Sequence, residues 1–89
     1  MSITLAKFGA HWCQACLVMD SIIDEFKENY PDVHIVRVDV DESPEITAKR
    51  RVTKIPTVIF FAGYKTVDRI NSSCSLERLE EAYEKCGGE

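Results

Sequence analysis

The feature that most constrains the fold of this chain is the order of its first three apolar segments. Residues 3–8 are rich in β-forming side chains and too short for a helix, whereas residues 13–28 carry apolar side chains at helical spacing. The helical set is Leu17, Met19, Ile22, Ile23 and Phe26. Residues 33–40 alternate apolar and polar side chains over their second half, as a strand does. Two strands joined through a helix run parallel with a right-handed crossover, so this half predicts a β-α-β unit.

The next part of the chain predicts a short helix followed by a hairpin. Ser43 can cap a helix that begins at Pro44 and runs to about Arg51. Residues 56–61 are an apolar strand, and residues 65–70 pair back on it after a turn.

The last segment predicts one more helix. Ser75 is a residue type that caps helices, and Gly87 and Gly88 are typical of a helix end. Its apolar stripe is Leu76, Leu79, Ala82 and Tyr83. The elements together predict an α/β fold in the order β-α-β-α-β-β-α, with a four-stranded mixed sheet and helices on both faces. We expect residues 1–89 to form a single domain, because a chain of this length supports one core.

Charge and composition exclude several classes of protein. The 89 residues include 11 Lys and Arg against 15 Asp and Glu, a net charge of -4, which disfavours nucleic acid and anionic membranes as partners. A hydrophobic share of 45% argues against disorder. No apolar run approaches the ~20 residues of a membrane helix, and residues 1–10 do not resemble a signal peptide. The sequence therefore predicts a cytoplasmic protein.

Cys13 and Cys16 lie where the first predicted strand gives way to the first helix. Unpaired backbone N–H groups at a helix start carry partial positive charge and stabilise a sulfur as thiolate. Cys16 follows one helical turn later, so the two sulfurs can come within bonding distance. We expect Cys13 to be the outer, attacking thiol and Cys16 the inner thiol that resolves the mixed disulfide. The Cys13–Cys16 disulfide would then be the redox-active group, with no separate cofactor.

A zinc site is the main alternative for this cysteine pair. Structural zinc needs four ligands, and the remaining cysteines, Cys74 and Cys86, are not spaced as a second pair. If the last helix runs between them they lie about 18 Å apart, too far for a mutual disulfide. We expect no metal site, and we interpret Cys74 and Cys86 as half-buried or free thiols.

Three blocks of sequence resemble the thioredoxin family over almost the whole chain. They are residues 8–16 (FGAHWCQAC), residues 36–41 (VRVDVD) and residues 55–57 (IPT). Their order and spacing are together highly specific. The family's usual first strand and helix are missing, so the chain resembles short archaeal and phage thioredoxins, whose core approaches that of glutaredoxin. The resemblance implies the thioredoxin fold and a thiol-disulfide oxidoreductase.

The resemblance also implies a substrate-binding surface around the cysteines. Pro56 would follow a cis peptide bond and lie beside the cysteines, and the backbone of Ile55 would pair with an extended substrate segment. Trp12 would form an apolar rim beside Cys13. The other expected contact residues are Gln14, Ala15, Ile70 and Asn71.

Two sites depart from the family pattern. Gln14 and Ala15 stand where thioredoxins usually have Gly-Pro, which leaves the redox potential open. Lys7 aligns with a buried acid that is considered to help deprotonate the inner thiol. Lys7 can be an amphipathic side chain that reaches the edge of the protein, or a cation that stabilises thiolate and makes the protein more oxidising. Arg37 is expected to pair with Asp39 or to face water.

The leading functional hypothesis is a monomeric protein-disulfide reductase. Its partners would be protein disulfides and a thioredoxin-reductase-like flavoprotein that recharges it. A glutathione-dependent, glutaredoxin-like protein is the second hypothesis, but Trp12 before Cys13 favours thioredoxin, because glutaredoxins typically carry Pro-Tyr or Pro-Phe between the cysteines. The third is a thioredoxin-fold binding module without redox turnover, which the presence of both cysteines disfavours.

Overall fold

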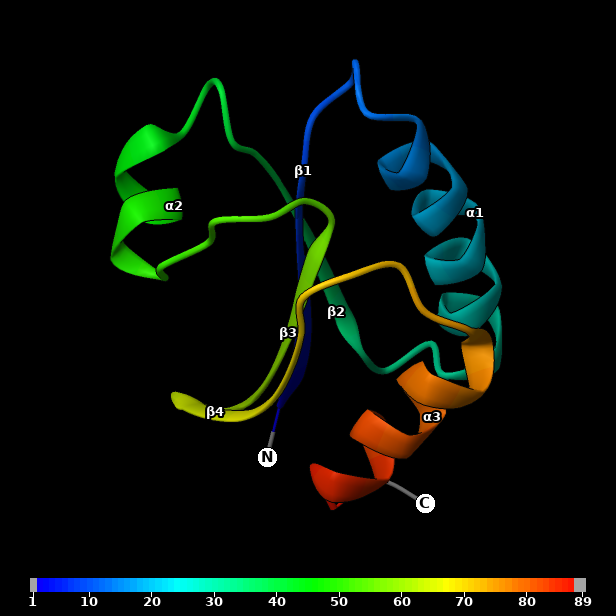
Figure 1. The fold of residues 1–89 in the computed structure, drawn as a ribbon. Helices are drawn as coiled ribbons and strands as arrows, with labels where there is room; N and C mark the ends of the chain where they lie inside the picture. The colour runs from blue at the N-terminus through cyan, green and yellow to red at the C-terminus, as the bar shows by residue number, and fades with distance from the viewer. Residues whose placement is uncertain (1, 88–89) are drawn as a thin grey trace.

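A computed structural model describes residues 2–87 of the chain (Figure 1). Its elements are β1 (Ile3–Gly9), α1 (Gln14–Asn29), β2 (His34–Asp39), α2 (Pro44–Lys49), β3 (Thr57–Ala62), β4 (Lys65–Ile70) and α3 (Leu76–Lys85). This order confirms the predicted β-α-β-α-β-β-α sequence of elements. Of the two glycines expected to end the last helix, Gly87 has a left-handed φ of 87° and Gly88 lies outside the described residues.

The four strands form one mixed sheet in the order β2-β1-β3-β4. β1 runs parallel to β2, with Leu5 opposite Ile35, as the β-α-β prediction requires. β1 pairs antiparallel with β3, and β3 pairs antiparallel with β4. Because β1 has a neighbour on each side, its carboxyl end and the segment that follows it lie at the centre of the sheet edge.

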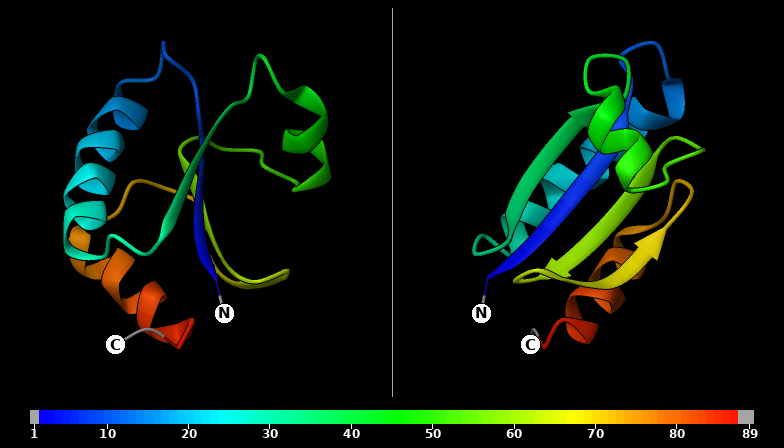
Figure 2. Two further views of the ribbon diagram at one scale, coloured as in Figure 1. Left: turned by 180° about the vertical axis from the view of Figure 1, so that it is seen from behind. Right: turned by 90° about the vertical axis from the view of Figure 1, so that its left-hand side faces the viewer.

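The helices cover both faces of the sheet, with α1 and α3 on one face and α2 on the other (Figures 1 and 2). The larger core lies under α1 and α3 and includes Leu5, Met19, Ile23, Phe26, Phe60 and Leu79. A smaller core of Ala6, Phe8 and Ile59 lies on the opposite face, with Ile46 of α2 packed against it. Since side chains alternate along a strand, Lys7 shares the face of Leu5 and points toward α1.

α1 buries most of its predicted apolar stripe, but one member was assigned wrongly. Met19, Ile23 and Phe26 are fully buried, whereas Leu17 is 48% exposed. Cys16 takes the core-facing place one turn before Met19 and is buried. Leu17 therefore lies to the side of the stripe, where it is available to line a surface.

α2 is shorter than predicted, because it ends at Lys49 and not at Arg51. Arg51 has a left-handed φ of 55°, which ends the helical hydrogen bonding. The Arg69 guanidinium donates hydrogen bonds to the carbonyls of Arg50 and Arg51 and holds this turn in place. Ser43 is at the expected N-cap, but its hydroxyl caps no N–H group within residues 2–87.

α3 begins as predicted and is fastened to β4 by charge. The Ser75 hydroxyl accepts a hydrogen bond from the Arg78 N–H at 3.2 Å. The Asp68 carboxylate on β4 accepts from Arg78 at 2.8 Å and from Lys85 at 3.3 Å.

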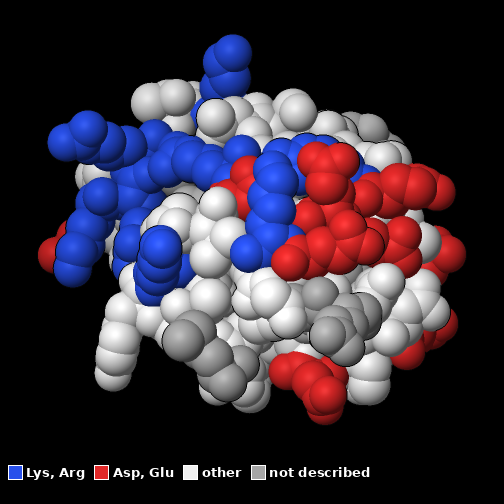
Figure 3. All heavy atoms as spheres, turned by 90° about the horizontal axis from the view of Figure 1, so that it is seen from below, with Lys and Arg blue, Asp and Glu red and all other residues white. Residues whose placement is uncertain are grey.

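The surface of the protein is divided by charge. Seen from below, it has a side rich in Lys and Arg and a side rich in Asp and Glu (Figure 3). None of the helices among residues 2–87 has the length and apolarity to cross a bilayer.

Candidate active site

The first cysteine of the pair occupies the N-cap of α1. Cys13 has extended backbone angles, φ -96° and ψ 110°, and its sulfur accepts a hydrogen bond from the Cys16 N–H at 3.2 Å. Its carbonyl accepts from the Cys16 N–H at 3.1 Å and from the Leu17 N–H at 3.2 Å. The Cys13 sulfur thus takes the place that a serine or threonine oxygen holds at other helix starts.

The second cysteine lies inside the protein. Cys16 is 1% exposed, whereas Cys13 is partly exposed. Burial raises the pKa of the Cys16 thiol, and the hydrogen bond with Cys13 and the charge of Cys13 raise it further, while the Ala10 backbone and Lys7 lower it. Cys16 is therefore held as a protonated thiol at neutral pH. The predicted outer and inner positions of the two cysteines are what the structure has.

Gly9 leaves a gap that the side chains of Cys16 and Lys7 both border. A Cβ atom at Gly9 would lie 3.0 Å from the Cys16 sulfur and 3.1 Å from the Lys7 Nζ. Both atoms border the same small space, so they are no more than about 6 Å apart. Any side chain at position 9 would push against both groups.

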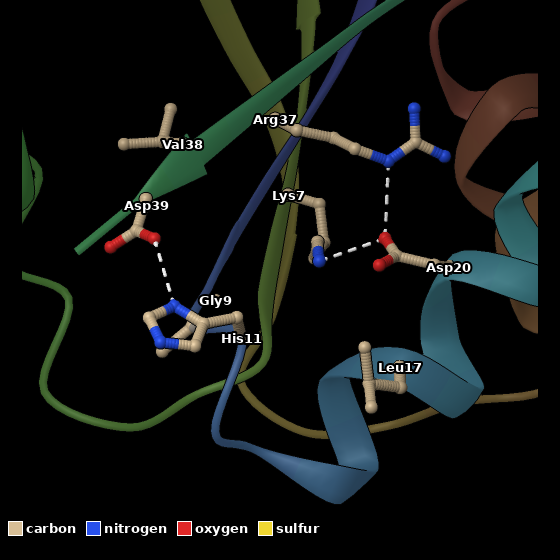
Figure 4. Close-up of a pocket in the computed structure, with 9 residues that line it drawn as sticks. Lys7, Gly9, His11, Leu17, Asp20, Arg37, Val38 and Asp39 are labelled. Carbon is tan, nitrogen blue, oxygen red and sulfur yellow. Dashed lines mark hydrogen bonds and ion pairs between the residues drawn. The ribbon is translucent and has the colours of Figure 1, made fainter. Parts of the chain in front are cut away.

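Lys7 is buried and forms an ion pair. It is 6% exposed, and its Nζ lies 2.8 Å from the Asp20 carboxylate of α1 (Figure 4). The interpretation of Lys7 as a side chain that reaches the edge of the protein is therefore wrong. The alternative interpretation, a cation beside the inner thiol, has the required geometry, and its effect on the redox potential stays a prediction.

Arg37 joins the same cluster, contrary to expectation. Its Nε lies 3.1 Å from Asp20 and its Nη2 lies 3.0 Å from Asp24. The predicted pairing of Arg37 with Asp39 is wrong, whereas its side chain is 43% exposed and so still faces water in part. The Asp39 carboxylate instead accepts hydrogen bonds from the N–H groups of Asp41 and Glu42.

Asp20 is an acidic residue of the site that no sequence pattern predicted. Although burial raises its pKa, hydrogen bonds from Lys7 and Arg37 lower it more, so the net shift is downward and the carboxylate is ionised at neutral pH. Asp20 follows Cys16 by four residues, which places both on one face of a helix. That spacing, read together with Lys7 on the facing strand, is the signal that could have found it.

A groove connects this cluster with the surface. Its volume is about 230 Å³, and its lining includes Lys7, His11, Leu17, Asp20, Arg37 and Asp39 (Figure 4). His11 lies at the mouth, with its Nδ1 3.7 Å from the Asp39 carboxylate and 84% of its side chain exposed. The exposed Leu17 forms part of the wall. Solvent can reach the Lys7–Asp20 pair from this side.

The residues expected to contact substrate differ in their exposure to solvent. Trp12 is 65% exposed, and its indole N–H donates to Asp41 at 2.7 Å. The Ile55–Pro56 peptide bond is cis, as the resemblance implies. Gln14, Ala15 and Asn71 are exposed, Ile55 is partly exposed, and Pro56 and Ile70 are buried. Their role in binding substrate stays a prediction.

The other cysteines flank α3. Cys74 and Cys86 are partly buried free thiols that pack against the larger core, and burial raises the pKa of both. Their interpretation as half-buried or free thiols is confirmed. Among residues 2–87, no three His, Cys, Asp or Glu side chains are grouped so as to hold a metal ion.

The chain is similar to thioredoxins both in sequence and in structure. The sequence profile of the thioredoxin family matches residues 1–85. The chain is 34% identical over 84 residues to a thioredoxin of Staphylococcus saprophyticus, covering 93% of this chain and 81% of that protein. It is 35% identical over 68 residues to thioredoxin-2 of Saccharomyces cerevisiae, covering 76% of this chain and 65% of that protein. The crystal structure of oxidised mitochondrial thioredoxin 3 from the same yeast superposes with a TM-score of 0.85 at 30% identity, over 93% of this chain and 77% of that one.

Proposed function

The chain belongs to the thioredoxin family of thiol-disulfide oxidoreductases, with its CxxC pair at Cys13 and Cys16, and on this premise we propose how the two cysteines divide the reduction of a protein disulfide. The Cys13 thiolate attacks one sulfur of the substrate disulfide. The substrate S–S bond breaks, and the departing sulfur leaves as a thiolate that takes a proton from solvent. Cys13 and the substrate are then joined by a mixed disulfide.

The second half-reaction is assigned to Cys16. Its thiol loses a proton, and the resulting thiolate attacks the Cys13 sulfur. The Cys13–substrate bond breaks, and the second substrate sulfur leaves as a thiolate and is protonated. The substrate has then gained two electrons and two protons, while Cys13 and Cys16 have become a disulfide.

The observation that carries this assignment is the different placement of the two sulfurs. Cys13 is the partly exposed N-cap of α1, so a substrate can reach it, whereas Cys16 is 1% exposed. The Cys16 N–H donates to the Cys13 sulfur, which places the two residues next to each other for the second step.

Disulfide reduction with insulin as substrate tests the assignment. Cys13→Ser is expected to abolish turnover, because no thiol is left at the exposed position. Cys16→Ser is expected to stop after the first step and to accumulate a mixed disulfide that mass spectrometry detects. Cys74→Ser is the matched control and is expected to keep full activity. Turnover by the Cys13→Ser variant would overturn the proposal.

The electron donor is assigned to a thioredoxin-reductase-like flavoprotein, and the site of action to the cytoplasm. The family match and Trp12 directly before Cys13 support the donor, and the need for a compartment that keeps thiols reduced supports the location. Faster turnover with NADPH and a thioredoxin reductase than with glutathione is expected. The reverse result would favour the glutaredoxin-like alternative. The proposal treats residues 1–89 as one monomeric domain.

A further inference from the structure

A buried ammonium group lies beside the inner thiol, and one carboxylate compensates its charge. Lys7 is 6% exposed, and its Nζ and the Cys16 sulfur border the same gap over Gly9. Burying an ammonium ion in a protein is unfavourable unless an opposite charge accompanies it. Asp20, 2.8 Å from the Nζ, supplies that charge.

The charged and titratable groups of the site come from β1, α1, β2 and the loop between β1 and α1. Lys7 projects from β1, Cys13 is the N-cap of α1, and Asp20 lies within α1. From β2, Arg37 binds Asp20, and Asp39 lies with His11 at the mouth of the groove. Of the cations in this set, Lys7 is the one that borders the gap next to the sulfur.

We propose that Asp20 is a positioning residue for Cys16: it keeps the charged Lys7 side chain at the Gly9 gap, where the ammonium favours the Cys16 thiolate needed for the second half-reaction. This inference rests on the proposed function only in taking Cys16 as the resolving thiol. Arg37 keeps Asp20 ionised and in place by binding the same carboxylate oxygen, Oδ1, as Lys7 does.

Neutralising Asp20 is expected to lower the thiolate fraction of Cys16, and the positions of the charges give the reason. If Asp20 becomes neutral, the Lys7 ammonium is buried without a counter-charge. It can then move out through the groove or lose its proton, and both responses remove the positive charge beside Cys16. Asp20 acting only through its own negative charge would give the opposite sign, because loss of a nearby anion favours thiolate.

The test is a pH titration of the Cys16 ¹³Cβ chemical shift in the fully reduced protein. In Asp20→Asn the midpoint is expected to rise, so that the thiolate fraction of Cys16 at a fixed pH below the midpoint falls at least about threefold. Lys7→Met is expected to raise the midpoint as well. Adding Asp20→Asn to Lys7→Met is expected to give no further rise, because Asp20 acts through Lys7.

Two further variants separate the pair from its surroundings. Asp24→Asn removes the other Arg37 partner without touching Lys7, and it is expected to leave the midpoint as in the wild type. Asp20→Glu keeps a carboxylate and is expected to stay within about twofold of the wild-type thiolate fraction. Circular dichroism establishes that each variant is folded.

A lower or unchanged Cys16 midpoint in Asp20→Asn would overturn the inference, and so would an equal rise when Asp20→Asn is added to Lys7→Met. A raised midpoint in Asp24→Asn would also overturn it, as would an Asp20→Glu midpoint equal to that of Asp20→Asn. None of these readouts needs a substrate. If the wild-type protein does not reduce insulin while the titrations follow the expected pattern, the proposed function fails and the inference stands.

Discussion

At the scale of single residues, the site depends on the missing side chain at Gly9. The Cys16 sulfur and the Lys7 Nζ both border the space that a Cβ atom would fill. The strand that brings Lys7 toward α1 and the helix that carries Cys16 can approach this closely only because position 9 is a glycine.

Gly9→Ala is expected to destabilise the protein. The new methyl group would lie 3.0 Å from the Cys16 sulfur and 3.1 Å from its Cβ, which the helix backbone holds in place. Overpacking of this kind typically costs about 1–3 kcal/mol. The free energy of unfolding in urea measures the effect, and a value equal to that of the wild type would contradict it.

Lys7→Asp is expected to lower the redox potential. The Lys7 cation stabilises thiolate, which belongs to the reduced form, so removing it favours the disulfide. Each ~1.4 kcal/mol of lost preference lowers the potential by ~30 mV. Equilibration with glutathione measures it. Lys49→Asp, with the same charge change on exposed α2, is the control, and an equal or higher potential in Lys7→Asp would contradict the prediction.

At the scale of elements, local patterns predicted the order of helices and strands, but not the partners of charged side chains. The β-α-β unit and the Ser75 cap follow from periodicity and cap chemistry, which act within a few residues. The Arg37–Asp20 pair joins β2 to α1 across 17 residues of sequence, a separation that no local pattern covers. The end of α2 depends in the same way on Arg69, which is distant in sequence.

The Asp68 cluster that joins β4 to α3 is expected to make stability depend on pH. Hydrogen bonds from Arg78 outweigh the effect of burial and lower the pKa of Asp68 in the folded protein. A lowered folded-state pKa gives stability that is present above the unfolded value of about 4 and is lost as the pH falls further.

Asp68→Asn is therefore expected to destabilise the protein by about 1.5–3 kcal/mol at pH 7, since hydrogen bonds to charged groups contribute amounts of this order. The difference from the wild type should shrink as the pH falls below about 4, because the Asp68 carboxylate of the unfolded protein is protonated first, and it should vanish once the pH is below the lowered pKa of the folded protein. Urea unfolding at a series of pH values measures it. A difference that is constant across the series would show that Asp68 does not act through its charge.

At the scale of the whole molecule, the sheet separates two cores of different size. The larger lies under α1 and α3, and the smaller lies on the face that α2 covers. Every residue of α2 is partly or fully exposed, whereas α1 and α3 bury side chains completely. Global stability is therefore expected to depend mainly on the α1–α3 face.

Leu79→Ala tests this distribution. Leu79 is fully buried in the larger core, so its truncation is expected to cost about 2–5 kcal/mol of the free energy of unfolding. Val36→Ala, at a residue that is 46% exposed, is the matched control and is expected to cost much less. Urea denaturation measures both, and equal losses would contradict the assignment of the main core.

Trp12 gives the molecule a built-in optical reporter. It is the only tryptophan among the 89 residues, it directly precedes the thiol that changes its covalent state, and its indole N–H is fixed to Asp41 at 2.7 Å. With 65% of its surface exposed, anything that docks there changes its surroundings at once. Tryptophan fluorescence of the unlabelled protein therefore comes from Trp12 alone, and its emission wavelength and intensity can follow each catalytic cycle in real time.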